Sequence, residues 1–357
     1  MKVFKHSSKG LVLLLAVAAG MNAQAFSVDS SQQRTAQTAT LSTTQTTYVQ
    51  PAAQLTTKTN VVVQSAQTPT PQVATTTRVS VQPSTTATTA NYSSQSYANS
   101  LDQLALTTRS AAVLVYDLQT NQSIYAKNID AQRSIASVSK LMTAMVILDA
   151  QLDMREQITL IASDLVGAKQ ASTRLKAGDR MTRSEFTLMT LMRSENPAAK
   201  ALARTYPGGY DAFIAAMNQK ARDLGMYQTK FSDSSGLDPR NMSSASDLLI
   251  MMKAVNSDPR YHSIRNFSTA ANYDFYIAND SSGDRTYKGY SSNRLVNAGT
   301  YPIGVQKTGY IRESGYNVVM ETNINNRPAI IVLLGASSSE SRWSDAERIL
   351  TELAYRR

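Results

Sequence analysis

The sequence predicts an α+β domain in which one β-sheet is flanked by helices. Within residues 101–357, apolar runs typical of β-strands lie near both ends, at 110–129 and 305–337. Between them, the apolar residues mainly have the spacing of helices. A helical segment follows at 341–357, and its Trp343 is expected in the core rather than in a ligand platform. Because each apolar face needs a partner layer, the first and last strands are expected to complete one sheet.

Five segments have the composition of β-strands, at 110–118, 122–129, 305–311, 316–324 and 327–337. A turn around Thr120 and Asn121 is expected to join the first two strands. Asn325 and Asn326 supply the turn residues of a hairpin between the last two strands.

Helices are expected between these strands, where apolar spacing coincides with capping residues. Residues 137–150 read SVSKLMTAMVILDA, an apolar run of helix-forming residues. Thr182 and Glu185 form a capping box ahead of a helix whose body is 184–192. Pro197 suits the first position of the next helix.

The tetrapeptide Ser137-Val138-Ser139-Lys140 places a serine and a lysine one helical turn apart. A serine hydroxyl is a weak nucleophile without a base, and a lysine at i+3 lies on the same helical face. Ser137 also stands at the helix start, where unpaired NH groups favour developing negative charge. Lys140 acts as a base only if burial or a neighbouring cation, for which Lys307 is a candidate, lowers its pKa. The alternative is an N-cap serine followed by a solvated lysine.

A second motif, Ser194-Glu195-Asn196, follows the helix that opens with the capping box. It is expected in the loop before the next helix. Asn196 has an alternative role as the N-cap of that helix, and the two roles are compatible.

The third motif, Lys307-Thr308-Gly309, lies on a predicted strand. Lys-Thr-Gly is expected by chance only about 0.1 times in a chain of this length. A glycine at this point permits close approach of a ligand to the backbone. The alternative is a strand lysine whose head lies in water. Three motifs in this order favour an acyl-transfer site that needs no histidine.

The residue inventory excludes several other kinds of catalytic site. The chain has no cysteine and only two histidines, His6 and His262, so neither a zinc HExxH site nor a clustered-histidine metal site can be built. No metal or cofactor is therefore expected. A Ser-His-Asp triad would have to use His262, which lies in what reads as an ordinary loop or helix edge.

The formal net charge is +10, and part of that excess lies near the start of the chain. The remainder on 101–357 is modest and spread among many basic and acidic side chains. This balance suits attraction to an anionic polymer such as cell wall. It is no nucleic-acid signature, and no aromatic-basic RNA motif occurs.

The start of the chain, 1–25, reads as a secretory signal. Lysines precede the apolar stretch Leu11–Gly20, and a small-residue cleavage site ends at Ala25, so the mature chain is expected to begin at Phe26. An uncleaved signal anchor is the alternative, and no stable membrane anchor is expected once the signal is cleaved. The following segment, 26–100, is rich in threonine, serine, glutamine, alanine and valine and has no glycine. It is expected to be a disordered tether that acts as a spacer, carries sugar or does neither.

These motifs resemble those of the penicillin-binding, active-site-serine family of D-alanyl-D-alanine peptidases. The resemblance covers about 101–357, and the segments SVSKLMTAMV, SENPAA and KTGYIRESGYNVV look most like the small endopeptidases of the penicillin-binding protein seven and eight type. It implies a β-lactamase/transpeptidase-like fold, with an antiparallel sheet flanked by helices and a site between the sheet edge and a helical subdomain. It also implies a periplasmic enzyme that acts on peptidoglycan stem peptides and is inhibited covalently by β-lactam antibiotics.

The resemblance implies a catalytic role for four residues. Ser137 would attack the carbonyl carbon of a D-alanyl residue, and Lys140 would take its proton. Ser194 would relay the proton to the leaving amine. Asn196 would hold the substrate amide and the lysine. Water would then release the acyl-enzyme.

The same resemblance implies a substrate-binding role for the third motif. Lys307 and Thr308 would bind a substrate carboxylate through charge and hydroxyl contacts. Gly309 leads to Tyr310, whose backbone NH would form the oxyanion hole together with that of Ser137. The side chain at 310 is expected to matter little.

Other segments fit the family less sharply. Residues 231–237 and 246–248 resemble a family loop and helix start, but turn chemistry and an aspartate near a helix N-terminus explain them. Asn293 matches a position where the family often has asparagine, and a structural role is expected for it.

Endopeptidase action on stem-peptide cross-links is the first functional hypothesis, and carboxypeptidase removal of terminal D-alanine is the second. A serine β-lactamase is more distant, because no segment resembles the loop that carries the deacylating glutamate of class A enzymes. A non-catalytic wall-binding protein would be favoured only if the motifs were decayed, and all three are intact.

Overall fold

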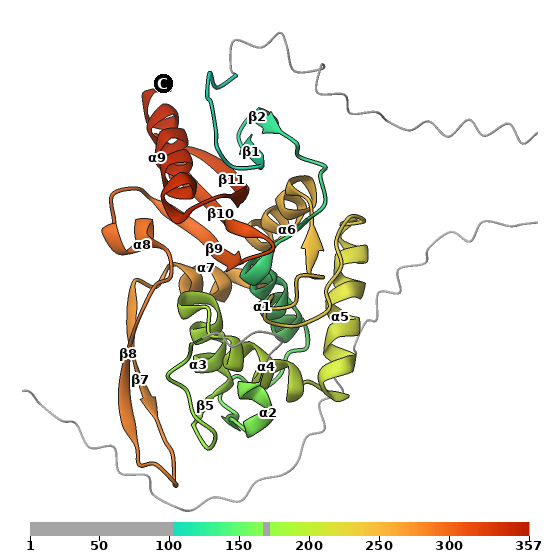
Figure 1. Ribbon diagram of the computed structural model, residues 1–357, viewed down its shortest axis with the longest axis vertical. Helices are drawn as coiled ribbons and strands as arrows, with labels where there is room; N and C mark the ends of the chain where they lie inside the picture. The colour runs from blue at the N-terminus through green and yellow to red at the C-terminus, as the bar shows by residue number, and fades with distance from the viewer. Residues whose placement is uncertain (1–102, 167–171, 357) are drawn as a thin grey trace, which may run out of the picture. The chain divides into compact units, whose positions relative to one another are not determined.

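The computed structural model describes residues 103–166 and 172–356 of the chain. The predicted signal, 1–25, and the predicted tether, 26–100, lie outside the described residues. The described part is an α+β domain built on a five-stranded antiparallel sheet (Figure 1). The predicted fold class is confirmed.

The central sheet joins the two ends of the domain, as predicted. Its strands are β1 (Ala112–Asp117), β2 (Gln122–Lys127), β9 (Ile303–Ile311), β10 (Gly315–Ile324) and β11 (Arg327–Ala336). Their order is β2-β1-β11-β10-β9, so β1 pairs with β11 and β9 lies at the edge. Asn121, Asn325 and Asn326 have φ of 55°, 55° and 60° in the two predicted turns, a left-handed conformation that asparagine tolerates.

The sheet is buried on both faces. Along β1, Val113 and Val115 enter one core cluster and Ala112 and Leu114 enter the other, as the period of two in a strand requires. The first cluster is covered by α9 (Ser339–Tyr355) (Figure 1). Trp343 is 3% exposed there, which confirms the prediction that it belongs to the core.

The second core cluster joins the sheet to the helical part of the domain. Its helices are α1 (Lys140–Asp149), α2 (Ala162–Leu165), α3 (Arg183–Leu188), α4 (Asn196–Arg204), α5 (Gly209–Asp223), α6 (Ala245–Ser257) and α7 (His262–Thr269), with the 3-10 turns η1 (Ala136–Ser139) and η3 (Pro259–Tyr261). A short helix, α8 (Arg294–Ala298), precedes β9. Among the described residues, no helix has the length and apolar character needed to cross a membrane.

Several local expectations need correction. The helix expected over 184–192 ends early, and a π-helical turn, η2 (Met189–Arg193), follows α3. The Thr182 capping box itself is present. The middle region is not wholly helical, because it contains a long hairpin of β7 (Asn272–Ile277) and β8 (Arg285–Tyr290). Two short strand pairs also occur there, β3 (Arg133–Ser134) with β6 (Met242–Ser243) and β4 (Gln157–Thr159) with β5 (Arg180–Thr182).

Candidate active site

Ser137 lies in the turn η1, just ahead of α1 and against strand β9. The expected helix start is therefore a 3-10 turn, and α1 begins at Lys140. Gly309 on β9 makes the close approach possible, because a methyl group there would lie 2.8 Å from the Ile135 carbonyl oxygen and 3.0 Å from the Ser137 backbone nitrogen. A residue with a side chain would push the strand away from the serine.

The Lys140 amine is the centre of the site. It is fully buried, and its Nζ lies 2.8 Å from Ser137 Oγ, 2.7 Å from Asn196 Oδ1 and 2.5 Å from the Ser235 carbonyl oxygen. The first and second motifs therefore meet at one nitrogen. The alternative of a solvated lysine at this position is wrong.

Burial lowers the pKa of Lys140 to about 7, while the negative charges of Asp233 and Glu195 act to raise it. Burial is thus the main cause of the lowered pKa. The repulsion between Lys140 and Lys307, the other candidate, acts in the same direction and is expressed in the lowered pKa of Lys307. A neutral amine has two N–H groups and one lone pair. The N–H groups match the Asn196 and Ser235 oxygens, so the lone pair is left to accept from the Ser137 hydroxyl. This is the arrangement of a base and its nucleophile.

The loop that carries Ser235 completes the lysine's surroundings. The Asp233 carboxylate accepts hydrogen bonds from Gly236 N at 2.6 Å, Ser235 Oγ at 2.8 Å and Asn241 Nδ2 at 2.9 Å, which fixes the turn. Gly236 has φ of 81°, and a methyl group on it would lie 2.0 Å from the Ala136 carbonyl oxygen. The sequence identified this segment as turn chemistry, which is correct, but gave no signal that its carbonyl group contacts Lys140.

The second motif spans the junction between η2 and α4. Ser194 is half-buried and has φ of 65°. It is not among the three groups that contact the Lys140 amine. Glu195 occupies the N-cap position of α4 and Asn196 is its first residue, so the alternative role of Asn196 as the N-cap is wrong. The Glu195 carboxylate is buried, which raises its pKa, and it accepts a 2.8 Å hydrogen bond from Thr173 Oγ1.

The third motif places a second buried lysine in the site. Lys307 is 0% exposed, so the alternative of a lysine head in water is wrong. Burial, and then the charges of Lys140 and Arg342, hold the pKa of Lys307 well below its ordinary value. Its Nζ donates to the Thr308 carbonyl oxygen at 3.0 Å.

The side chains that follow Lys307 on β9 differ in exposure. Thr308 Oγ1 lies 2.8 Å from Ser292 Oγ. Tyr310 is 52% exposed, and its ring stacks on that of Tyr316 with centroids 4.2 Å apart. The motif therefore presents a shielded amine and hydroxyl beside an accessible aromatic ring.

Two further residues have the ordinary roles expected of them. Asn293 is buried and caps α8, since its Oδ1 accepts from Leu295 N at 2.9 Å while its Nδ2 donates to Gln306 Oε1 at 3.1 Å. His262 is an exposed residue at the start of α7. Within the described residues no group of three or more histidine, cysteine or acidic side chains is placed to hold a metal ion.

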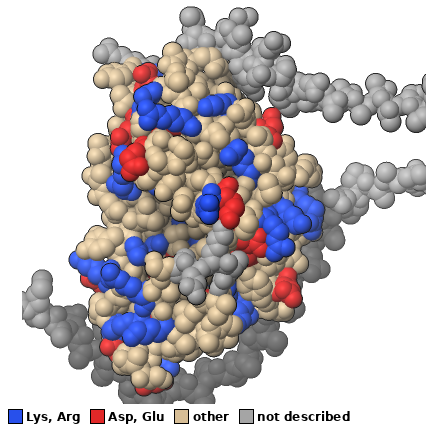
Figure 2. All heavy atoms as spheres, in the orientation of Figure 1, with Lys and Arg blue, Asp and Glu red and all other residues tan. Residues whose placement is uncertain are grey.

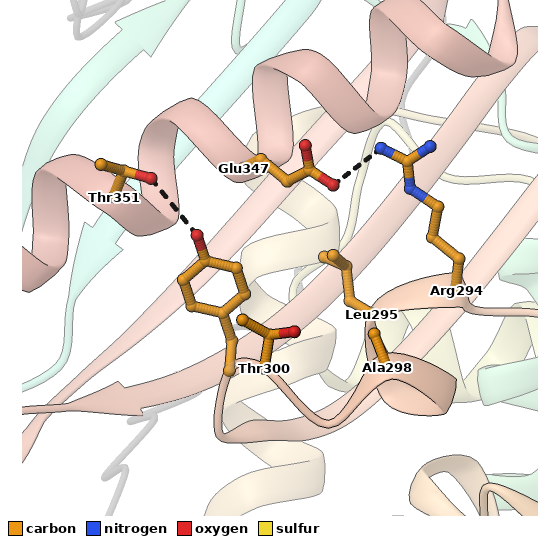
Figure 3. A pocket seen from close by; sticks show the side chains of 7 residues that line it. Arg294, Leu295, Ala298, Thr300, Glu347 and Thr351 are labelled. Carbon is orange, nitrogen blue, oxygen red and sulfur yellow. Dashed lines mark hydrogen bonds and ion pairs between the residues drawn. The ribbon is translucent and has the colours of Figure 1, made fainter.

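A cavity of about 440 Å³ lies apart from these motifs, between α8 and α9 (Figure 3). Its walls include Arg294 and Glu347, which form an ion pair at 2.7 Å, and Tyr301, whose hydroxyl lies 3.3 Å from Thr351 Oγ1. None of the motif residues lines it.

A serine hydroxyl in contact with a buried lysine amine, at the edge of an antiparallel sheet flanked by helices, defines an active-site-serine hydrolase. Comparison with known proteins identifies the family within this class. A match to the family described as D-alanyl-D-alanine carboxypeptidase covers residues 95–338, and the chain belongs to that family of serine peptidases.

Individual relatives carry two related names. The chain is 38% identical to the D-alanyl-D-alanine endopeptidase of Escherichia coli K12 over 242 residues, which are 68% of this chain and 76% of that protein. It is 36% identical to the protein of the same name from Pseudomonas aeruginosa, over 67% of this chain and 76% of that protein. The D-alanyl-D-alanine carboxypeptidase DacF of Bacillus subtilis is 30% identical, over 70% of this chain and 62% of that protein.

Solved structures give the same fold. The Streptomyces K15 DD-transpeptidase matches with a TM-score of 0.63 and 27% identity, over 69% of this chain and 97% of that chain. Penicillin-binding protein D2 of Listeria monocytogenes, in its ampicillin-bound form, matches with a TM-score of 0.59 and 26% identity, over 71% of this chain and 100% of that chain.

Proposed function

We propose that this protein is a peptidoglycan D-alanyl-D-alanine endopeptidase that cleaves stem-peptide cross-links through a serine acyl-enzyme. The observation that carries the proposal is the 2.8 Å contact between Lys140 Nζ and Ser137 Oγ inside a buried site. The endopeptidase names of the Escherichia coli and Pseudomonas aeruginosa relatives support the choice of substrate.

In the first half-reaction, Ser137 Oγ forms a bond to the carbonyl carbon of the D-alanyl residue as its proton passes to the Lys140 amine. The backbone NH groups of Ser137 and Tyr310 stabilise the resulting oxyanion, and one such donor is typically worth about 3 kcal/mol. Ser194 relays the proton to the leaving amine. The carbon–nitrogen bond then breaks and the acyl-enzyme remains.

In the second half-reaction, a water molecule attacks the ester carbonyl carbon and gives its proton to the neutral Lys140 amine. Ser137 takes the proton back as the ester bond breaks. Asn196 and the Ser235 carbonyl group accept from the lysine in both protonation states, so the amine changes its charge without changing its place.

Lys307 and Thr308 receive the carboxylate of the leaving residue. A buried lysine with a lowered pKa is readily deprotonated, but a bound anion favours its charged form. Carboxylate binding and protonation of Lys307 are therefore coupled. A substrate that lacks the carboxylate is expected to bind weakly.

Covalent labelling tests the acyl-enzyme mechanism. Fluorescent penicillin is expected to label the purified protein and to leave Ser137→Ala unlabelled, and the ampicillin-bound relative supports this choice of probe. A labelled Ser137→Ala variant, or an unlabelled wild-type protein with normal folding, would refute the mechanism.

Digestion of purified muropeptides tests the substrate. An endopeptidase releases monomers from cross-linked dimers. Loss of terminal D-alanine alone would replace this proposal with carboxypeptidase action, the activity after which the family is named.

The proposed site of action is the periplasm, after removal of the signal 1–25. Segment 26–100 then tethers the catalytic domain that begins near residue 101. N-terminal sequencing of the exported protein is expected to begin at Phe26. Retention of residues 1–25 in the membrane fraction would favour an uncleaved signal anchor instead.

A further inference from the structure

The hairpin of β7 and β8 is a two-stranded ribbon with one buried and one exposed face. The register pairs Asn272 with Tyr290 and Tyr276 with Thr286, and paired residues project on the same side of an antiparallel ribbon. All six side chains of one face are exposed: Asn272, Asp274, Tyr276, Thr286, Lys288 and Tyr290. The opposite face is buried at Phe275, Ile277 and Tyr287, although Tyr273 on that face is 40% exposed. In Figure 1 the ribbon extends along the edge of the helical part of the domain.

Two tyrosine rings are prominent on the exposed face. Tyr276 is 59% exposed and Tyr290 is 52% exposed, and they belong to a small set of large apolar side chains that the described residues expose. The Tyr276 hydroxyl donates to Asp284 Oδ2 at 2.6 Å, and Lys288 Nζ lies 5.9 Å from the centroid of the Tyr290 ring. Both rings are therefore held in place by a neighbour while their surfaces remain accessible.

The exposed face leads directly to the active site. The alternation of exposed and buried residues along β8 continues past Tyr290 to Ser292, which is half-buried. Ser292 Oγ lies 2.8 Å from Thr308 Oγ1, and Ser292 N donates to the Met192 carbonyl oxygen at 2.9 Å. Ser292 thereby connects the ribbon to Thr308 of the third motif and to η2, the turn that precedes the second motif.

We propose that the exposed face of the β7–β8 ribbon binds the glycan strand of peptidoglycan next to the stem peptide under attack. This inference rests on the proposed function, because only a polymeric substrate extends beyond the active site. Six residues of β-strand span about 20 Å, which is long enough to contact more than a single sugar.

The chemistry of the face fits sugar better than peptide. Exposed tyrosine rings offer flat apolar surfaces to the CH groups of a sugar, and the Asn272 amide and Thr286 hydroxyl offer hydrogen bonds. Asp274 and Lys288 are cross-strand partners of opposite charge, so the face has no net charge with which to select an anionic stem peptide. Figure 2 shows basic side chains in several separate groups on the face that it draws.

The double variant Tyr276→Ala/Tyr290→Ala tests the proposal in the full-length protein. Binding is measured by calorimetry with peptide-free glycan strands and by co-sedimentation with intact sacculi. Loss of both stacking surfaces is expected to weaken the affinity about tenfold, which corresponds to about 1.4 kcal/mol. The rate of penicillin labelling is expected to stay unchanged, because the probe does not reach the ribbon, and this rate also reports that the variant is folded.

The matched control is Tyr227→Ala/Tyr355→Ala, which removes two tyrosines that are 84% and 79% exposed elsewhere on the chain. An unchanged glycan affinity in the ribbon variant, or an equal loss in the control, would overturn the proposal. Weaker binding of sugar-free stem-peptide dimers with unchanged glycan affinity would assign the ribbon to peptide and overturn it as well. A wild-type protein that binds glycan but resists penicillin would instead contradict the proposed function.

Discussion

Gly309 and Ser137 lie so close together that a methyl group on the glycine would be 3.0 Å from the serine backbone nitrogen. That nitrogen carries one of the two NH groups proposed for the oxyanion hole. Strand β9 therefore sets the position of the nucleophile as well as that of the third motif.

Gly309→Ala is expected to slow acylation by fluorescent penicillin about 100-fold, since the strand must move and the NH donors no longer converge. The second-order rate constant of labelling measures the effect. Gly283→Ala is the control for a strained glycine change away from the site, because Gly283 has φ of 80° and a methyl group there meets nothing within 4 Å. Wild-type labelling by Gly309→Ala would show that the close approach has no catalytic role.

The rate of acylation is expected to depend on pH with an apparent pKa near 7, the value to which burial lowers the pKa of Lys140. Above this pH the amine is neutral and accepts the serine proton. Below it the amine is protonated, so the rate falls about tenfold for each pH unit. Stopped-flow labelling across the pH range gives the profile, and a flat rate from about pH 5 to 8 would exclude Lys140 as the base.

Asp233→Asn is expected to move this acid limb to lower pH, because the Asp233 charge acts to raise the pKa of Lys140. The maximum rate is expected to fall as well, since the loop that presents the Ser235 carbonyl group loses one of the two acceptor oxygens of Asp233. Asp238→Asn is the matched control, because its carboxylate pairs with Arg240. A lower rate with an unmoved acid limb would limit Asp233 to shaping the loop.

Trp343→Ala is expected to lower the free energy of unfolding by about 3–5 kcal/mol, the usual cost of emptying a large buried site. Trp343 is a residue of α9, is 3% exposed in the core between this helix and the sheet, and has the Arg342 guanidinium 4.2 Å from its ring centroid. Urea denaturation measures the change. Tyr355→Ala on the same helix, where the side chain is 79% exposed, is expected to stay within about 0.5 kcal/mol of the wild type.

The sheet and its turns were predictable because their signals are local. Asn325 and Asn326 mark a hairpin by their tolerance of positive φ, and both have it. The β7–β8 ribbon was not predicted, because its exposed tyrosines and charged residues interrupt the apolar pattern that is typical of a buried strand. The π-helical turn after α3 was not predicted either, because the spacing of apolar residues does not distinguish it from an α-helix.

The three motifs of the site could be predicted from the sequence, but the contacts between their residues could be predicted only in part. The contact between Lys140 and Ser137 joins residues three positions apart, which a helical turn nearly fixes. The contact between Lys140 and Ser235 joins residues 95 positions apart through a backbone carbonyl group. A pattern of side chains in the sequence does not predict such a contact. The burial that lowers the pKa of Lys140 is likewise a property of the packed domain.

The backbones of Gly236 and Gly309 both lie in close contact with the short turn that bears Ser137. The turn is consequently immobilised when the domain folds, and the entropy of fixing it is not lost again with each substrate molecule. A reactive hydroxyl prepared in this way meets every incoming acyl group, whether wall peptide or antibiotic, in the same orientation.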